Sequence, residues 1–301
     1  MKLGLNVRNF GPSADPKGLR AWARFAEDAG FALAMMSDHV ASTPDVDETY
    51  PAPFYDPFTT ISWLAALTTT LELGTSVTIA PYRHPLQTAR VVANIDRFSD
   101  GRFVLGVASG WSEPEFAALG VPYARRGAMT DDHLRVLVDF WTRERISHDS
   151  EFVTFTDVAT GPAPVRRPHP PIWVGGAAPV AIRRAARFGD AWHPANPDLT
   201  WLRDIGLPAL RDAAAVLGKP APPVAPRVQL DVRQEHVELP DRPAGTGTLE
   251  QIAADLDTIA ALGASYVVLD TNPGDPHDRR SLREDFYVLE TVARHWRDQR
   301  S

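Results

Sequence analysis

Residues 19–39, LRAWARFAEDAGFALAMMSDH, contain the unit that decides the fold. The first part has the three- and four-residue apolar spacing of a helix with one buried face, at Leu19, Trp22, Ala23 and Ala26. Gly30 follows where such a helix needs a left-handed residue to end it. The apolar run from Phe31 to Ser37 then predicts a buried strand, so the stretch is the helix-to-strand half of a parallel-sheet unit.

The same alternation continues along the whole chain. We identify eight apolar runs typical of strands: Leu3–Val7, Phe31–Ser37, Leu71–Ile79, Phe103–Ala108, Ile172–Val174, Ala191–His193, Val228–Val232 and Tyr266–Asp270. Helical patterns separate them, as at Leu134, Leu137, Val138 and Trp141. Eight strand–helix units in succession predict an α/β fold, a single (β/α)8 TIM barrel.

The length and the loops favour one domain over residues 1–301. The chain has 301 residues, and barrels of this kind take about 250. Two proline-rich stretches, Gly161–Pro171 and Pro220–Pro226, are each followed by a strand that continues the alternation, so they predict loops. Alternating apolar residues over 151–158 predict a small hairpin, inserted within residues 146–170.

Composition excludes several classes of function. Lys and Arg number 31 against 38 Asp and Glu, giving a net charge of -7, which disfavours nucleic acid as a partner. The chain has no cysteine, which excludes disulfides, thiolate metal sites and cysteine nucleophiles. The nine histidines lack metal-ligand spacing, so we expect no metal site. Redox chemistry would therefore need a bound organic cofactor.

The apolar segments are too short or too interrupted for a membrane. The N-terminal MKLGLNVRNFGPS is apolar for only a few residues before Arg8 and Gly11. The stretch from Pro57 to Leu71 is broken by threonines and stops at Glu72. We therefore expect no membrane partner and a cytoplasmic location.

Asp38 and His39 follow the second predicted strand. Barrel enzymes carry their chemistry at the carboxyl ends of the strands. A histidine there can act as a general acid or base, because its unperturbed pKa of about 6.5 makes both forms available. The alternative is a structural Asp and His that cap the following loop.

Gly175 and Gly176 follow the fifth predicted strand and precede a helical pattern beginning at Pro179. Their backbone amides could open toward an anion such as phosphate at the start of that helix. The alternative is a tight strand-to-helix turn, since the pair lacks the dinucleotide-binding fingerprint. Asn6 and His193 also stand at strand ends and have structural alternatives of the same kind.

Several segments together resemble one family. They are residues 26–31 leading to Ser37-Asp38-His39, Tyr55-Asp56-Pro57-Phe58, residues 73–77, residues 100–103 running into 106–110, residues 170–176 and Gly189-Asp190-Ala191-Trp192. In this order they resemble the bacterial luciferase-like monooxygenase family. The closest resemblance is to the branch of reductases that use coenzyme F420, an 8-hydroxy-5-deazaflavin. This resemblance implies a TIM barrel, a small-molecule substrate and a homodimer.

The resemblance also implies roles for individual residues. His39 would contact the reacting substrate atom as the catalytic residue, and Asp38 would lie against the cofactor ring. The other implied cofactor-binding residues are Thr75, Ser76 and Val77 under the ring, Ala108, Ser109 and Gly110 along the tail and ring edge, and Gly175, Gly176 and Ala177 at the phosphate. The resemblance also implies that the strand bulges at Thr75-Ser76-Val77, often with a non-proline cis peptide between Ser76 and Val77. The expected substrate pocket contains Asn6, Trp111 and His193.

The chain departs from the family at Trp111. F420-dependent sugar phosphate dehydrogenases and some alcohol dehydrogenases have a glutamate immediately after the glycine that matches Gly110. Here Trp111 takes that position, and Glu113 and Glu115 are shifted along the chain. Oxidation of an alcohol is thereby put in doubt.

Three functions remain open from the sequence. The leading hypothesis is an oxidoreductase that transfers a hydride between coenzyme F420 and a small organic substrate, with His39 handling the proton. The first alternative is a reduced-FMN-dependent monooxygenase on the same fold. The second is a protein that binds a flavin or deazaflavin without turnover, because fold alone does not fix function.

Overall fold

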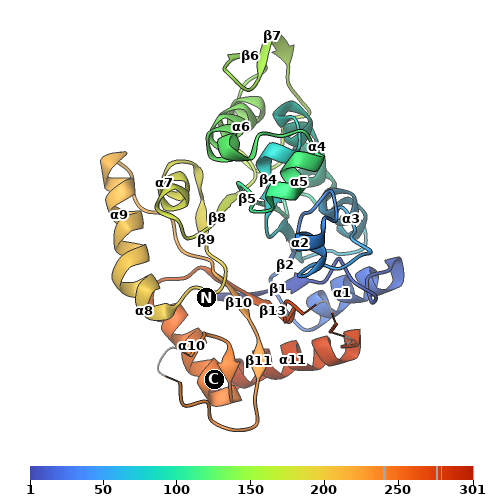
Figure 1. The fold of residues 1–301 in the computed structure, drawn as a ribbon, viewed down its shortest axis with the longest axis vertical. Helices are drawn as coiled ribbons and strands as arrows, with labels where there is room; N and C mark the ends of the chain where they lie inside the picture. The colour runs from blue at the N-terminus through green and yellow to red at the C-terminus, as the bar shows by residue number, and fades with distance from the viewer. Residues whose placement is uncertain (240–241, 276, 279, 301) are drawn as a thin grey trace.

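The computed structural model describes every residue except 240–241, 276, 279 and 301. Parallel strands form a barrel at its centre, and helices surround them (Figure 1). The barrel strands are β1 Lys2–Val7, β2 Leu33–Met36, β3 Glu72–Thr75 with its continuation β4 Thr78–Ile79, β5 Phe103–Ala108, β8 Ile172–Gly175, β9 Ala191–His193, β10 Arg227–Gln229 and β13 Tyr266–Asp270. The α/β barrel predicted from the alternation is confirmed.

The order of the strands in the sheet is β10, β13, β1, β2, β3, β5, β8, β9. All of these pairs are parallel. Isolated parallel bridges, Trp192 to Val224 and Ala195 to Arg227, connect β9 with the chain at β10. The sheet therefore nearly closes, and the carboxyl ends of all the strands meet at one mouth.

Two of the predicted strands are divided in the structure. The run over 71–79 is interrupted at Ser76 and Val77, where the peptide bond is cis. The run over 228–232 gives β10 and a separate short strand, β11 Asp231–Val232, which pairs with β12 Thr246–Gly247. Apolar pattern alone predicted continuous strands and could not show either break.

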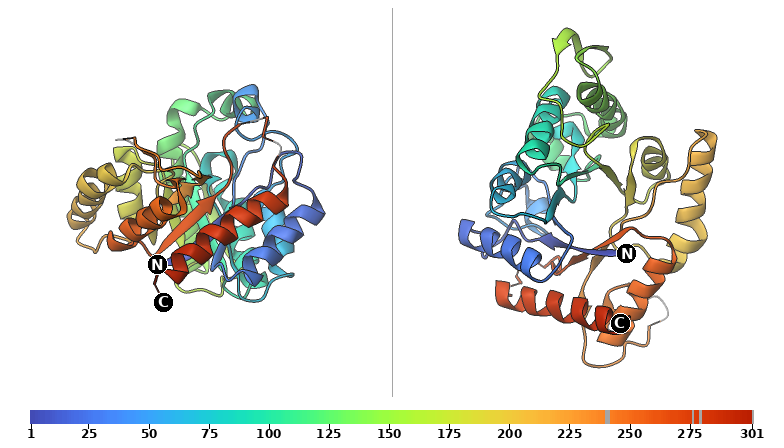
Figure 2. Two further views of the ribbon diagram at one scale, coloured as in Figure 1. Left: turned by 90° about the horizontal axis from the view of Figure 1, so that it is seen from below. Right: turned by 180° about the vertical axis from the view of Figure 1, so that it is seen from behind.

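The helices that cover the barrel follow the predicted apolar faces. They are α1 Pro16–Asp28, α2 Pro44–Asp47, α3 Pro57–Ala65, α4 Pro85–Phe98, α5 Glu113–Ala118, α6 Arg126–Thr142, α7 Pro179–Phe188, α8 Leu199–Trp201, α9 Leu207–Val216, α10 Leu249–Ala261 and α11 Leu282–Asp298. Short helical turns are η1 Ala80–Tyr82, η2 Tyr123–Arg125 and η3 Leu202–Gly206. Figure 2 shows the first and last long helices, blue α1 and red α11, side by side on the barrel, where Phe25 stacks on Phe286.

The apolar core has two parts. The larger part fills the space between the strands and the helices and includes Leu19, Trp22, Ala23 and Ala26. The smaller part lies inside the barrel and includes Leu33, Met35, Val104, Trp173 and Val268. A filled interior leaves the mouth as the place where a ligand can enter.

An antiparallel hairpin extends from the barrel at the top of Figure 1. Its strands are β6 Arg145–Asp149 and β7 Thr154–Ala159. The sequence predicted a hairpin over 151–158, and the structure begins it six residues earlier, because β6 alternates less regularly. Of the helices described, none is long and apolar enough to cross a membrane.

Candidate active site

A pocket of about 190 Å³ lies at the mouth of the barrel. Six residues expected to bind the cofactor or the substrate line it: Asp38, His39, Ser76, Val77, Gly175 and Gly176. Trp111 and His193, from the expected substrate pocket, line it as well. Ser37, Tyr50 and Arg227 also line it and were missed by the sequence analysis. The strand ends thus bring together residues that lie far apart in the chain.

The other expected residues lie away from this lining. Thr75 turns its hydroxyl to the carbonyl oxygen of Gly106, at 2.7 Å. Asn6 is fully buried and donates to Asp270 at 3.3 Å. Ala108 ends β5, and residues 108–110 are not among the residues that line the pocket. Ala177 lines a separate groove along α7.

His39 is held by a glutamate. The Nδ1 atom of His39 lies 2.6 Å from Oε2 of Glu115, and both side chains are buried. Because a carboxylate only accepts hydrogen bonds, Nδ1 carries a proton in this pair. The neutral ring then has Nε2 as its proton-accepting atom, and no described residue bonds to Nε2.

Glu115 is fixed in its ionised form. Its Oε1 accepts the backbone N–H groups of Val40 at 2.6 Å and Ala41 at 3.0 Å, and the Tyr82 hydroxyl donates to Oε2 at 2.8 Å. Burial favours the neutral acid, but these bonds and the one from His39 outweigh it and lower the pKa of Glu115. A carboxylate whose pKa is lowered therefore stands behind the imidazole.

The start of α5 places this glutamate. Ser112 is the N-cap of the helix and accepts the N–H of Glu115 at 3.1 Å. A serine followed three residues later by a glutamate is the spacing of a capping box, in which the glutamate would bond back to the cap. Here the carboxylate turns to His39 instead. That spacing was the available signal in the sequence, but it predicts a local role.

Asp38 is fully engaged by its neighbours. Arg83 donates to both of its carboxylate oxygens, at 2.7 and 2.8 Å, and the N–H of Ile79 donates at 3.0 Å. The buried carboxylate thereby fixes the segment that follows the break between β3 and β4. Asp38 lines the pocket, and its charge is compensated by Arg83.

Ser76 is clamped in place by two side chains from distant strands. Its Oγ lies 2.9 Å from Nε2 of His193, and its carbonyl oxygen accepts a bond from Nη1 of Arg227 at 3.2 Å. Its N–H donates to the carbonyl of Met36 at 2.7 Å. The wall of the pocket between β3 and β4 is therefore rigid.

His193 supports this wall as a neutral ring. Its Nδ1 faces the carbonyl oxygen of Ala225, so that nitrogen carries the proton and Nε2 accepts from the Ser76 hydroxyl. Burial lowers the pKa of His193 to about 4. His193 was expected in the substrate pocket. Its ring lines the pocket, but both ring nitrogens are committed to partners within the protein.

Arg227 is the cation at the floor of the pocket. Its Nε donates to Asp270 at 2.8 Å, and Asp270 in turn accepts from Asn6 and from the N–H of Asn272. Burial disfavours the charge, but Asp270 and Tyr50 outweigh that effect and raise the pKa of Arg227. Asn6 is therefore two contacts away from the pocket, as a support for this ion pair.

Aromatic side chains form the outer wall. The ring of His39 lies 4.9 Å from that of Tyr50 and 5.8 Å from that of Trp111, between centroids. Trp111 is 46% exposed, which is unusual for so large an apolar side chain next to a buried histidine. Trp111 places an indole at the position after Gly110, and the carboxylate that bonds to His39 is Glu115, from further along the chain.

The turn between β8 and α7 leaves its backbone open. Gly176 has φ of +102°, a conformation that favours glycine. The N-cap of α7 is Ala178, which offers no side-chain cap, and residues 176–180 are exposed. Uncapped amide groups at a helix start can bind an anion.

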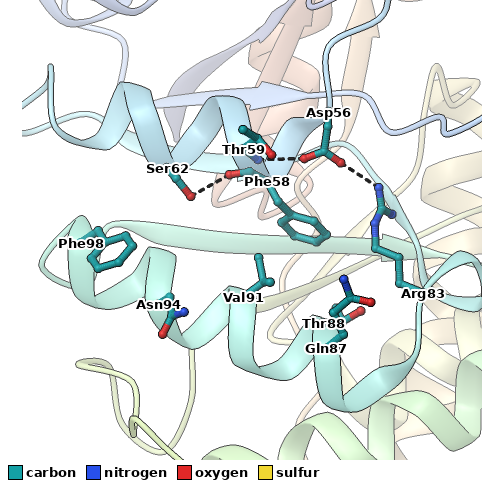
Figure 3. Close-up of a pocket in the computed structure, with 10 residues that line it drawn as sticks. All are labelled: Asp56, Phe58, Thr59, Ser62, Arg83, Gln87, Thr88, Val91, Asn94 and Phe98. Carbon is teal, nitrogen blue, oxygen red and sulfur yellow. Dashed lines mark hydrogen bonds and ion pairs between the residues drawn. The ribbon is translucent and has the colours of Figure 1, made fainter.

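A second cavity, of about 460 Å³, lies between α3 and α4 on the outside of the barrel (Figure 3). Phe58 and Val91 point into it from the two helices, and Arg83 closes one end by pairing with Asp56 at 3.0 Å. Apart from Asp56 and Arg83, the residues that line this cavity belong to α3 or α4. The buried acid–base pair instead marks the mouth pocket as the candidate active site.

Fold and site together define a barrel enzyme whose polar groups converge at the carboxyl ends of the strands. The family model of the luciferase-like monooxygenases matches residues 1–236. An uncharacterised protein of Mycobacterium tuberculosis is 32% identical over 262 residues, covering 78% of this chain and 93% of the relative. The chain belongs to the luciferase-like monooxygenase family, as its sequence segments predicted.

Other relatives differ in cofactor. The FMNH2-dependent dimethylsulfone monooxygenase of Pseudomonas putida is 32% identical over 181 residues, which is 59% of this chain and 48% of that enzyme. The monooxygenase RslO1 from Streptomyces bottropensis superimposes with a TM-score of 0.83 at 21% identity over the full length of both chains. An F420-dependent secondary alcohol dehydrogenase gives 0.81 at 15% identity over 98% of both. Flavin and deazaflavin enzymes thus share this fold.

Proposed function

We propose that the protein is an oxidoreductase that transfers a hydride between coenzyme F420 and a small organic substrate at the barrel mouth. The observation that carries the proposal is the His39–Glu115 pair, 2.6 Å apart and facing the pocket. When bound, the deazaflavin would supply the carbon atom that accepts or donates the hydride. The protein would supply the proton site and the orientation of the reactants.

The proton would move at Nε2 of His39. Glu115 keeps the proton on Nδ1, so Nε2 can accept a proton from a substrate hydroxyl or amine as hydride leaves the adjoining carbon. In the reverse direction the protonated ring donates from Nε2 to the oxygen or nitrogen that is being reduced. The ionised Glu115 stabilises the imidazolium in both directions.

The residues around the pocket fit a flavin-like group. The rigid segment at Ser76 and Val77 offers a flat wall, and the exposed amides at Gly176 and Ala177 suit a phosphate at the start of α7. The Ser37 hydroxyl is buried in the lining without a partner among the described residues, as a donor that a ligand would satisfy after a side-chain rotation.

A binding titration tests the cofactor. Purified protein is titrated with oxidised F420 and, separately, with FMN, following tryptophan fluorescence and the cofactor spectrum. We expect tight binding of F420 and weak binding of FMN. Binding of FMN alone would overturn the assignment of F420 as the cofactor. Binding of neither would overturn the proposal that the protein uses a flavin or deazaflavin. His39→Ala should bind F420 as the wild type does and lose turnover.

A second candidate is a monooxygenase that uses reduced FMN. The 32% identity to the dimethylsulfone monooxygenase favours it. Formation of an oxygenated product from the substrate with reduced FMN and oxygen separates the two. Reduced FMN alone also consumes oxygen, and hydride transfer from a deazaflavin forms no oxygenated product. A protein that holds either cofactor tightly but turns over no substrate with any donor would instead be a binding protein.

A further inference from the structure

Two adjoining cavities run along α7 on the outside of the barrel. One, of about 470 Å³, begins at Ala177 and Pro179 and is walled by Ile205 and α9. The other, of about 380 Å³, continues to Arg187 and Leu217. They share Arg183, Ala213 and Val216, so they adjoin along α7, and we call the two together the α7–α9 groove.

The groove starts beside the candidate active site. Gly176 lines the mouth pocket, and the next residue, Ala177, lines the upper end of the groove. Between them lie the open amides at the start of α7. A ligand with an anionic group at this turn could therefore extend in both directions, into the pocket and along α7.

The charge of the groove is mainly positive. Arg183 and Arg187 have no acidic partner among the residues that the structure describes. Arg184 is committed to Asp131 at 2.6 Å, which cancels both charges. Asp212 adds one carboxylate to the lining. Two free cations against one free carboxylate favour an anionic occupant.

The two arginines of the groove are spaced one helical turn apart, and exposed apolar side chains lie beside them. Arg183 and Arg187 are four residues apart on one helix, a rise of about 6 Å. Val180 and Val216 expose 55% and 87% of their surfaces beside them. This arrangement suits a flexible chain in which carboxylates recur at a short interval and are separated by methylene groups.

We infer that the α7–α9 groove binds the acidic tail of coenzyme F420. Beyond its phosphate, F420 continues into a lactyl group and a chain of γ-linked glutamates, whereas FMN ends at the phosphate. The inference rests on the proposed function in its deazaflavin form. Arg183 and Arg187 would then distinguish F420 from FMN by contacting the glutamate tail. That tail takes no part in hydride transfer.

The test compares two forms of the cofactor by equilibrium binding at low ionic strength. One carries its glutamate chain, and the other is the glutamate-free form that ends at the lactyl group. We expect the wild type to bind the tailed form about 10-fold tighter. Arg183→Glu and Arg187→Glu should each weaken the tailed form several-fold and leave the short form unchanged. Salt at 0.5 M should reduce the difference.

Two further variants supply controls. Asp212→Asn removes the opposing carboxylate of the lining, so it should tighten the tailed form only. Arg211→Glu makes the same charge change on α9 outside the lining and should alter neither affinity. Circular dichroism checks that each variant is folded.

Each outcome decides the inference. Equal affinities of the wild type for the two forms would overturn the groove proposal while leaving F420 as cofactor. Binding of neither form would overturn the proposed function and this inference together. If Arg183→Glu and Arg187→Glu change the oligomeric state in sedimentation and leave both affinities unchanged, the groove is a contact between copies of the chain and the inference is wrong.

Discussion

The Nδ1 atom of His39 lies 2.6 Å from Oε2 of Glu115, although the two residues are 76 positions apart in the chain. His39 follows β2, and Glu115 belongs to α5. The pair exists only because the loops after β2 and β5 meet at the barrel mouth. It gives His39 one defined tautomer and a fixed direction for Nε2, which is what a general acid or base requires.

Glu115→Gln should reduce turnover strongly with little effect on cofactor affinity. The glutamine amide can donate to Nδ1, which would place the ring proton on Nε2, the wrong atom for accepting one. A change of this kind at an orienting carboxylate lowers kcat by about 10⁴-fold in the serine protease triad. We expect a loss of 10² to 10⁴-fold, measured as kcat with F420 at saturation.

The matched control for Glu115 is Glu113→Gln. Glu113 lies in the same first turn of α5, but its side chain is exposed. The Glu113→Gln variant should have a kcat within about a factor of two of the wild-type value. Equal losses in the two variants would show that the carboxylate at Glu115 has no special relation to His39.

Removing the cation that faces Asp38 should destabilise the fold. Arg83→Met leaves Asp38 with a fully buried side chain and, among the residues that the structure describes, only the N–H of Ile79 as partner. Removing one partner of a buried ion pair lowers the free energy of unfolding by about 3–5 kcal/mol. Urea unfolding at pH 7 measures the loss.

The double variant Arg83→Met with Asp38→Asn separates charge from packing. It removes the uncompensated carboxylate, so it should regain part of the stability that Arg83→Met alone loses. If the double variant loses as much stability as Arg83→Met and Asp38→Asn lose together, the two side chains act independently.

The stability of the protein should fall in acid because of His193. Its pKa is about 4 in the fold and 6.5 in the unfolded chain, so the unfolded state binds the proton first as pH decreases. The contribution of His193 to the free energy of unfolding is complete above pH 6.5 and is lost as the pH falls toward 4. The slope is about 1.4 kcal/mol per pH unit for one proton.

His193→Gln should show a shallower decline of unfolding free energy between pH 6.5 and 4, measured by urea unfolding at several pH values. Burial also lowers the pKa of His133. That residue is present in both proteins, so its effect cancels in the comparison. Parallel curves for wild type and variant would contradict the buried neutral assignment of His193.

Much of the fold could be predicted from the sequence, because apolar spacing is local. The strand Ala191–His193 was predicted with its observed ends, although it has only three residues. The eight strands and the helix faces follow from side chains that must be buried on one side of each element. The break at Ser76 was implied by the family resemblance and not by the apolar pattern. The break after Gln229 could not be predicted, because it depends on contacts with another strand.

The candidate site was predictable only in part. Its position at His39 follows from the rule that barrel chemistry lies at the strand ends. Glu115 and Arg227 could not be found, since the partner of each lies more than 40 residues away and only the closed barrel brings them together. The spacing from Ser112 to Glu115 predicts a helix cap and says nothing about His39.

Gly106 on β5 lies where the backbone approaches β3 closely. A Cβ built at Gly106 would lie 1.8 Å from the carbonyl oxygen of Thr75, an overlap that neither strand can relieve without moving. Alanine normally stabilises a strand or helix relative to glycine by about 0.5–1 kcal/mol. Gly106→Ala should instead lower the free energy of unfolding by several kcal/mol, since Thr75 adjoins the clamped residue Ser76.

The control for Gly106 is Gly127→Ala in α6, where the nearest atom to an added Cβ outside the helix's own backbone is Nη2 of Arg184 at 3.6 Å. That variant should be as stable as the wild type or more stable by up to about 1 kcal/mol. Thermal and urea unfolding compare the two, and F420 titration of any folded Gly106→Ala protein should show weakened binding. Normal stability of Gly106→Ala would mean that the strands at the pocket wall separate easily, contrary to the rigid wall inferred for Ser76.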